Sequence, residues 1–191
     1  STPTSTLASV SSSPLSASIV ATATLSAASA TSTDYETVVL YQHNIHRANH
    51  SASDFVWNST LASIAQEIGE TCIYEHNTEV GGGGYGQNIG AGWSAAEVGA
   101  MITDAMYNDE MMNFQDLYGE ANPNMTNFEH WGHFSQIVWK NSASVGCATV
   151  LCDELENFGS NSSFTVCNFY PAGNYAGEYG DNVGEPLGDA M

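Results

Sequence analysis

The chain has 191 residues, a length typical of one domain with a tail. Its 21 acidic residues far outnumber two basic ones, Arg47 and Lys140, so the formal net charge is −19 at pH 7. A chain of this charge repels phosphate backbones and anionic membrane surfaces, so we expect no nucleic-acid partner. No apolar run approaches the roughly 20 residues that span a bilayer, and no transmembrane segment is expected.

Residues 1–32 consist almost wholly of Ser, Thr, Ala and aliphatic residues and carry no charge. Such a segment buries too little apolar surface to offset the entropy of ordering the chain. We interpret it as a disordered leader, and an O-glycosylated stalk is an equal alternative. The folded domain is expected over residues 33–180, and residues 181–191, rich in Gly, Asp and Glu, are expected to form an acidic C-terminal coil.

The first helix is predicted over residues 34–49, behind a capping-box pattern that begins at Thr33. Its apolar stripe is marked by Val38, Tyr41 and Ile45 at helical spacing. Three histidines fall on the side away from this stripe: His43, His46 and His50. Imidazoles at these spacings can ligate a transition metal, but a polar helix face is the simpler interpretation.

Two further helices are predicted from apolar spacing, one ending near Gly69 and one over residues 95–112 behind a capping box at Ser94. The glycine run 81–86 between them lacks the strand, helix and basic groups of a phosphate site, so it is expected to be a loop. The β-rich runs 145–151 and 164–170 predict an antiparallel hairpin with a long turn. Helices first and strands later favour an α+β fold.

Four cysteines predict two disulfides, and three pairings are open from the count alone. The chain also carries four Asn-x-Ser/Thr glycosylation sequons, at Asn49, Asn58, Asn124 and Asn161. Cysteines and sequons together favour a secreted, extracellular glycoprotein.

One stretch, Gly-His-Phe-Ser-Gln-Ile-Val-Trp-Lys-Asn-Ser over residues 132–142, stands out for its specificity. It is followed by Val-Gly-Cys at 145–147 and by Cys-Asn-Phe-Tyr-Pro-Ala-Gly-Asn-Tyr at 167–175, and the first helix contains His-Asn-x-x-Arg at 43–47. This set resembles the CAP superfamily of cysteine-rich secretory, antigen 5 and pathogenesis-related class 1 proteins, in particular its fungal members. The resemblance implies an α–β–α sandwich, with a small antiparallel sheet between helical layers.

The resemblance also implies a central cavity lined by two histidines and two acidic residues. The matching positions here are His76, Gln87, Glu110 and His133. At Gln87 a neutral amide stands where the family has a carboxylate, so binding of a divalent cation, Zn²⁺ or Mg²⁺, should be weakened. No cofactor is expected to be required. The alternative is a hydrogen-bonded polar cavity that ties helix to sheet.

Sterol-binding relatives carry spaced aromatics before the Gly-His-Phe motif, and the candidates here are Phe114, Tyr118, Met125, Phe128 and Trp131. Pro123 departs from the relatives' aromatic pattern, and the alternative is that these side chains cover the core. For the disulfides, the resemblance implies Cys72 with Cys147 and Cys152 with Cys167.

The function that follows is a secreted, non-enzymatic binder of a small hydrophobic ligand, a sterol or a fatty acid, with a host–microbe effector or defence role. One alternative is an effector that binds a host protein and carries no lipid. Another is a metal-dependent hydrolase, which the sequence disfavours because Ser135 and His133, two positions apart on a helix, do not face each other.

Overall fold

The computed structural model describes residues 32–188 of the chain. The predicted leader therefore lies, apart from Ser32, outside the described residues, as do the last three residues of the predicted C-terminal coil.

A four-stranded sheet forms the middle layer, in the order β1-β3-β4-β2. Its strands are β1 (Val56–Trp57), β2 (Gly86–Ala91), β3 (Ser144–Leu155) and β4 (Gly159–Tyr170). Strands β2, β4 and β3 are antiparallel neighbours, whereas β1 runs parallel to β3. The predicted hairpin is confirmed, but its long turn is wrong, because the ladder continues to the Leu155–Gly159 pair.

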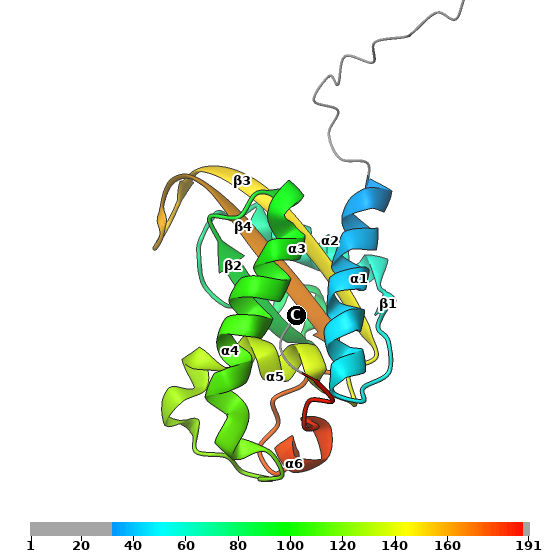
Figure 1. The fold of residues 1–191 in the computed structure, drawn as a ribbon. Helices are drawn as coiled ribbons and strands as arrows, with labels where there is room; N and C mark the ends of the chain where they lie inside the picture. The colour runs from blue at the N-terminus through cyan, green and yellow to red at the C-terminus, as the bar shows by residue number, and fades with distance from the viewer. Residues whose placement is uncertain (1–31, 189–191) are drawn as a thin grey trace, which may run out of the picture.

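Helices cover both faces of this sheet (Figure 1). One face packs against α2 (Ser59–Gly69), and the other lies under α1 (Ser32–Asn49), a long helical segment over 95–117 and α5 (Gly132–Val138). The expected α–β–α sandwich is confirmed. Side chains of β4 alternate between the two faces of the sheet and contribute to the core on each face. Phe164 and Val166 face α2, whereas Cys167 and Phe169 face the other helices.

The long helical segment changes its winding along its length. It consists of η2 (Ala95–Glu97), α3 (Val98–Ala100), a π-helical stretch η3 (Met101–Asn108), α4 (Asp109–Met111) and η4 (Met112–Leu117). The predicted capping box is present at its start, where the Ser94 hydroxyl accepts from the Glu97 amide and the Glu97 carboxylate accepts from the Ser94 amide. The segment ends at Leu117 rather than at the predicted residue 112. A shorter segment, η5 (Met125–His130), leads into α5.

Helix α1 turns its histidine face to the core, which reverses the sequence-based assignment. His43, His46 and His50 are each no more than 1% exposed, whereas Tyr41 is 62% exposed and Val38 is 38% exposed. Each imidazole has a hydrogen-bond partner, so the ring is buried like any other aromatic ring. The interpretation as a solvated polar face was wrong for that reason.

The disulfides pair Cys72 with Cys152 and Cys147 with Cys167, so both implied pairs were wrong. Cys147 and Cys167 stand opposite each other in the β3–β4 register, with a Cα–Cα distance of 4.1 Å. Positions 147 and 152 are an odd number of residues apart and therefore face opposite sides of the sheet. Cys152 accordingly lies in the core beside α2, next to Cys72, which follows that helix.

The C-terminal segment packs against the domain. Helix α6 (Tyr179–Asn182) crosses the expected boundary at residue 180, and Asn182 and Val183 are almost fully buried. Further along, the Leu187 amide donates to the Asn49 carbonyl at 2.8 Å. The described part of the predicted coil, residues 181–188, is therefore held by the fold.

Candidate functional site

Helix α4, within the long helical segment, and the first turn of α5 bring Glu110 and His133 together. The Nδ1–H of His133 donates to Glu110 Oε1 at 2.6 Å, and the Phe134 amide donates to Oε2 at 2.9 Å. Glu110 is only 7% exposed, so both of its oxygens are held inside the protein. This carboxylate fixes the orientation of the imidazole and leaves its Nε2 without a protein partner among the described residues.

His76 meets Gln87 on β2 in a parallel arrangement. Gln87 Oε1 accepts hydrogen bonds from His76 Nδ1 and from the Asn77 amide, both at 3.0 Å. Gln87 Nε2 donates to the Asn77 carbonyl at 2.9 Å and to Asn168 Oδ1 at 3.1 Å. Because an amide oxygen only accepts, Nδ1 of His76 carries the hydrogen. Burial lowers the pKa of His76, which keeps this ring neutral at pH 7.

These pairs border a cavity of about 350 Å³ between β2 and α5. Its lining residues are Tyr74, His76, Gln87, Asn88, Ile89, Phe128, Glu129, Gly132, His133 and Asn174. Three of the four residues expected to form the site line it, while Glu110 lies behind His133. Within residues 32–188, no third His, Cys, Asp or Glu joins the two histidines in a metal-holding group. Two imidazoles fall short of the three protein ligands of a typical zinc site, so a firmly bound zinc ion does not fit these residues.

Ser135 lies on α5 close to His133 in sequence but not in function. Its hydroxyl is 2.7 Å from Asn174 Oδ1, which accepts its hydrogen, and the residue is fully buried. A nucleophile needs its general base within hydrogen-bond reach. The Ser135 hydroxyl instead donates its hydrogen to Asn174, and no hydrogen bond joins it to His133 among the described residues.

The five candidate residues of the sterol loop do not converge on one site. Phe114 and Trp131 are each 1% exposed and pack edge to face in the main core. Phe128 packs edge to face against Trp131 at a centroid distance of 5.0 Å, and it also lines the cavity that contains His76 and His133. Met125 is exposed on η5, and Tyr118 lies beside a different hollow.

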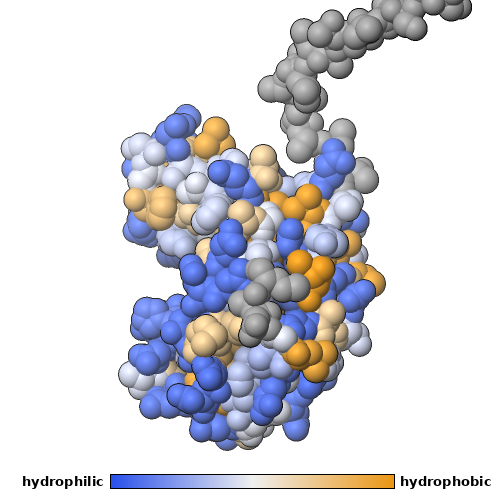
Figure 2. Space-filling view, viewed as in Figure 1, coloured by the Kyte–Doolittle hydropathy of each residue, from blue (hydrophilic) through white to orange (hydrophobic). Residues whose placement is uncertain are grey.

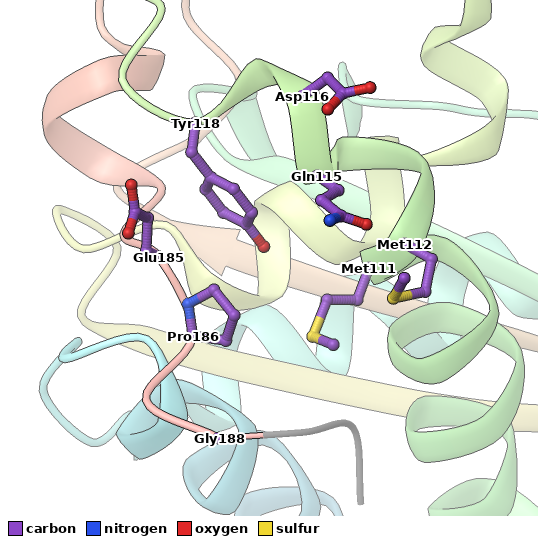
Figure 3. Close-up of a pocket in the computed structure, with 8 residues that line it drawn as sticks. All are labelled: Met111, Met112, Gln115, Asp116, Tyr118, Glu185, Pro186 and Gly188. Atoms are coloured by element: carbon purple, nitrogen blue, oxygen red, sulfur yellow. The ribbon is translucent and has the colours of Figure 1, made fainter.

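That hollow, the methionine groove, has a volume of about 690 Å³. It lies between the end of the long helix and the C-terminal segment, as Figure 3 shows. Its lining residues are Met111, Met112, Gln115, Asp116, Tyr118, Glu185, Pro186 and Gly188. Sequence reasoning missed this groove because the two walls are about 70 residues apart; the adjacent methionines at the end of a helix were the only local signal.

A second groove, of about 630 Å³, lies between the N-terminal part of α1 and α2. Tyr35 on α1 and Trp57 on β1 contribute to its lining, and Cys147 to Thr149 of β3 form part of its wall. The Tyr35 hydroxyl bonds to Thr149 Oγ1 at 2.8 Å across it.

The four sequon asparagines differ in how the fold uses their amides. Asn124 and Asn161 are exposed. Asn49 Nδ2 donates to the Tyr107 hydroxyl at 2.8 Å, and Asn58 caps α2 by accepting from the amides of Thr60 and Leu61. Glycosylation stays a prediction at all four, with the side chains of Asn124 and Asn161 the more accessible.

The layered fold and the cavity histidines can now be set beside what similarity to known proteins shows. The chain belongs to the family described as "CAP: Cysteine-rich secretory protein family", which matches residues 40–169. The expected resemblance is confirmed.

Among curated proteins, the chain is 46% identical to a probable pathogenesis-related protein of Arthroderma benhamiae, over 83% of this chain and 51% of that protein. It is 33% identical to Protein PRY2 of Saccharomyces cerevisiae, over 78% of this chain and 41% of that protein. The chain thus spans about half the length of the curated relatives it matches.

Among solved structures, the chain is similar to one described as NaASP2 with Zn²⁺. The TM-score is 0.54 at 21% identity, covering 82% of this chain and 86% of that one. At this identity the likeness supports the shared fold. No helix among residues 32–188 is long and apolar enough to span a membrane.

Proposed function

We propose that this CAP-family chain is a secreted, non-enzymatic binder of a small hydrophobic ligand, a sterol or a fatty acid. The observation that carries the proposal is the methionine groove. Its volume falls within the range of roughly 300–1,000 Å³ that is typical of small-molecule sites.

The walls of the groove suit an apolar ligand. Met111 is buried at its base, while Met112 is 61% exposed and Pro186 lies on the opposite, C-terminal wall (Figure 3). Unbranched methionine side chains adapt to ligands of different shape, which makes them frequent at permissive binding surfaces. The histidine cavity is about half as large, and the Gln87 amide that lines it is already bonded to the protein.

Secretion is supported by the cysteines. All four are paired in two disulfides, and such bonds persist in oxidising compartments.

The test is saturable binding of radiolabelled cholesterol, ergosterol and palmitate to the purified full chain. Met112→Asp places a charge in the groove and should weaken binding at least tenfold. The matched control is Met125→Asp, an exposed methionine on η5, which should leave binding unchanged. Absence of saturable binding for all three lipids contradicts the function, and loss in Met125→Asp but not in Met112→Asp contradicts the groove as its site.

A protein partner is the second candidate, favoured by apolar exposure on α1 and β1. Tyr41 and Val56 are 62% and 64% exposed, and Figure 2 shows apolar side chains along the α1 side of the molecule. The Asn44 side chain bonds to the Phe55 backbone in both directions, which holds these two elements together. Partner binding that is lost in a Tyr41→Asp, Val56→Asp double variant while lipid binding persists would favour this function.

A further inference from the structure

The methionine groove contains a polar atom that the described protein leaves unpaired. Among residues 32–188, the Tyr118 hydroxyl is buried and has no hydrogen-bond partner. Figure 3 shows it directed into the space between Gln115, Met111 and Pro186. A buried hydroxyl without a partner is unfavourable, so this atom is suited to a hydrogen bond with a bound molecule.

The Tyr118 ring is held in this direction by its neighbours. It packs edge to face against the buried Phe114 at a centroid distance of 5.1 Å. On another side it lies nearly parallel to His50, at 6.3 Å. The hydroxyl is therefore held toward the groove by a packed aromatic cluster, and a ligand reaches it once the side chains that cover it shift.

The charged groups of the groove are all acidic. Asp116 stands on the helical wall and Glu185 on the C-terminal wall, and no Lys, Arg or His of the described chain lines the groove. The chain has only two basic residues. Arg47 is buried, with its guanidinium bound to backbone carbonyls. Lys140 packs beside Gly184, behind the C-terminal wall, and does not line the groove.

His50 does not supply a positive charge either. Its Nδ1 donates to the Gly184 carbonyl at 2.7 Å, so Nε2 accepts from the Tyr107 hydroxyl at 2.9 Å. Burial is the main cause that lowers the pKa of His50 and keeps the ring neutral. Burial also raises the pKa of Tyr118, helped by Tyr107 and Glu185, so its hydroxyl stays protonated.

We propose that the methionine groove selects an uncharged amphiphile, whose alcohol or other neutral polar group bonds to the Tyr118 hydroxyl, and excludes an ionised carboxylate. This inference rests on the proposed function and narrows its ligand class. A carboxylate beside the Tyr118 hydroxyl would meet no cation among the described lining residues, would be repelled by Glu185, and would lose its hydration without compensation. A fatty acid therefore binds in its protonated form.

Dodecanol and dodecanoic acid, which share one chain and differ in the head group, provide the test. Binding to the full chain is measured by isothermal titration calorimetry from pH 5 to pH 8. Dodecanol affinity should stay flat, whereas dodecanoate affinity should fall about tenfold for each pH unit above the pKa of the free acid. Equal affinities for the two at pH 7.5 would overturn the inference.

Two variants test the residues. Tyr118→Phe should weaken dodecanol binding about tenfold by removing the hydrogen bond, with Tyr175→Phe, an exposed tyrosine outside the groove, as control. The double variant Asp116→Asn, Glu185→Gln should strengthen dodecanoate binding at pH 7.5 about tenfold and leave dodecanol unchanged. Its charge-matched control is Asp153→Asn, Glu154→Gln on the hairpin.

The outcomes distinguish the proposed small-ligand function from the proposed preference for a neutral head group. If neither compound binds at any pH, the small-ligand function fails together with its head-group preference. If both bind equally and the charge variant has no effect, only the preference for a neutral head group is wrong.

Discussion

Two sets of histidines in this molecule lie in different environments, one in the core and one at a cavity. On α1, the imidazoles of His43, His46 and His50 are buried in the aromatic core and bonded to the protein. At the cavity, His76 and His133 use one nitrogen for a protein partner and have no protein partner at Nε2 among the described residues. Histidine therefore stabilises the core in one region, and in the other it lines a cavity with one ring nitrogen unbonded.

The α1 set owes its position to neighbours that match imidazole in shape and polarity. His46 stacks on Tyr107 at a centroid distance of 3.8 Å while its Nε2 bonds to Thr103. His50 meets the edge of the same tyrosine and bonds to its hydroxyl. The cavity set has fewer such neighbours, and its two rings line a cavity of about 350 Å³ rather than a packed core.

The largest expected effect is on the α1 side, at Arg47. Its guanidinium donates to the carbonyls of Ile137, Trp139 and Ser142 and lies 3.7 Å from the Phe55 ring centroid. Arg47→Met leaves these buried acceptors unpaired and should lower the free energy of unfolding by about 4 kcal/mol in urea denaturation.

The matched control for that variant is Lys140→Met, which removes the only other basic residue. Lys140 is half-buried, so we expect a loss of at most about 1 kcal/mol. Equal losses in the two variants would show that net charge, and not the buried hydrogen bonds, governs the effect.

The next effect is a pH dependence of stability that comes from the same helix. Burial is the main cause that lowers the pKa of His43 and of His46 from 6.5 to about 4. Between these values the unfolded chain binds more protons, so stability present above pH 6.5 is lost as the pH falls toward 4. For the fully buried His43 the loss is on the order of 3 kcal/mol.

Urea denaturation from pH 7 to pH 4 measures this loss of stability. A variant of the two cavity histidines tests whether the loss comes from the α1 set. His76→Asn, His133→Asn should keep most of the slope, because the α1 rings are unchanged. A slope that disappears in the cavity variant would move the pH sensitivity from α1 to the cavity.

The smallest expected effect is at the cavity, in Gln87→Glu. The new carboxylate adds an anionic ligand beside His76 and should raise Zn²⁺ affinity about tenfold in competition with a chromophoric chelator. It also loses the two hydrogen bonds that Nε2 donates to Asn77 and Asn168, which should cost about 1–2 kcal/mol of stability.

Gln66→Glu, on the surface of α2, makes the same amide-to-carboxylate change away from the cavity. It should leave Zn²⁺ affinity unchanged. An unchanged affinity in Gln87→Glu as well would mean that position 87 does not decide how this cavity treats metal ions.

Short sequence patterns correctly predicted those elements whose structure depends on residues close together in the chain. The Ser94 capping box, the periodicity of α2 and the β-rich runs of the hairpin all depend on residues within a few positions, and all are confirmed. The motif at 132–142 likewise indicated the family and hence the layered fold.

The candidate site was predicted only in part. His76, Gln87 and His133 were expected together and do line one cavity. Gly146 in the Val-Gly-Cys motif shows the physical reason for one motif residue. Helix α2 passes so close that a side chain at position 146 would clash with the helix backbone at Ala62. The five sterol-loop candidates stay a prediction: the fold buries Phe114 and Trp131 in the core and leaves Met125 exposed.

The sequence by itself determined the family, the acidic composition, the main helices and the β3–β4 hairpin, because these depend on composition and short-range pattern. The tertiary structure decided which face of α1 is buried, which cysteines pair and where the methionine groove lies. Each of these depends on which distant segments meet: Tyr107 against α1, odd and even positions of β3 against opposite layers, and residues 185–188 against the end of the long helix. Such contacts follow from the packing of the whole chain, and no short stretch of sequence encodes them.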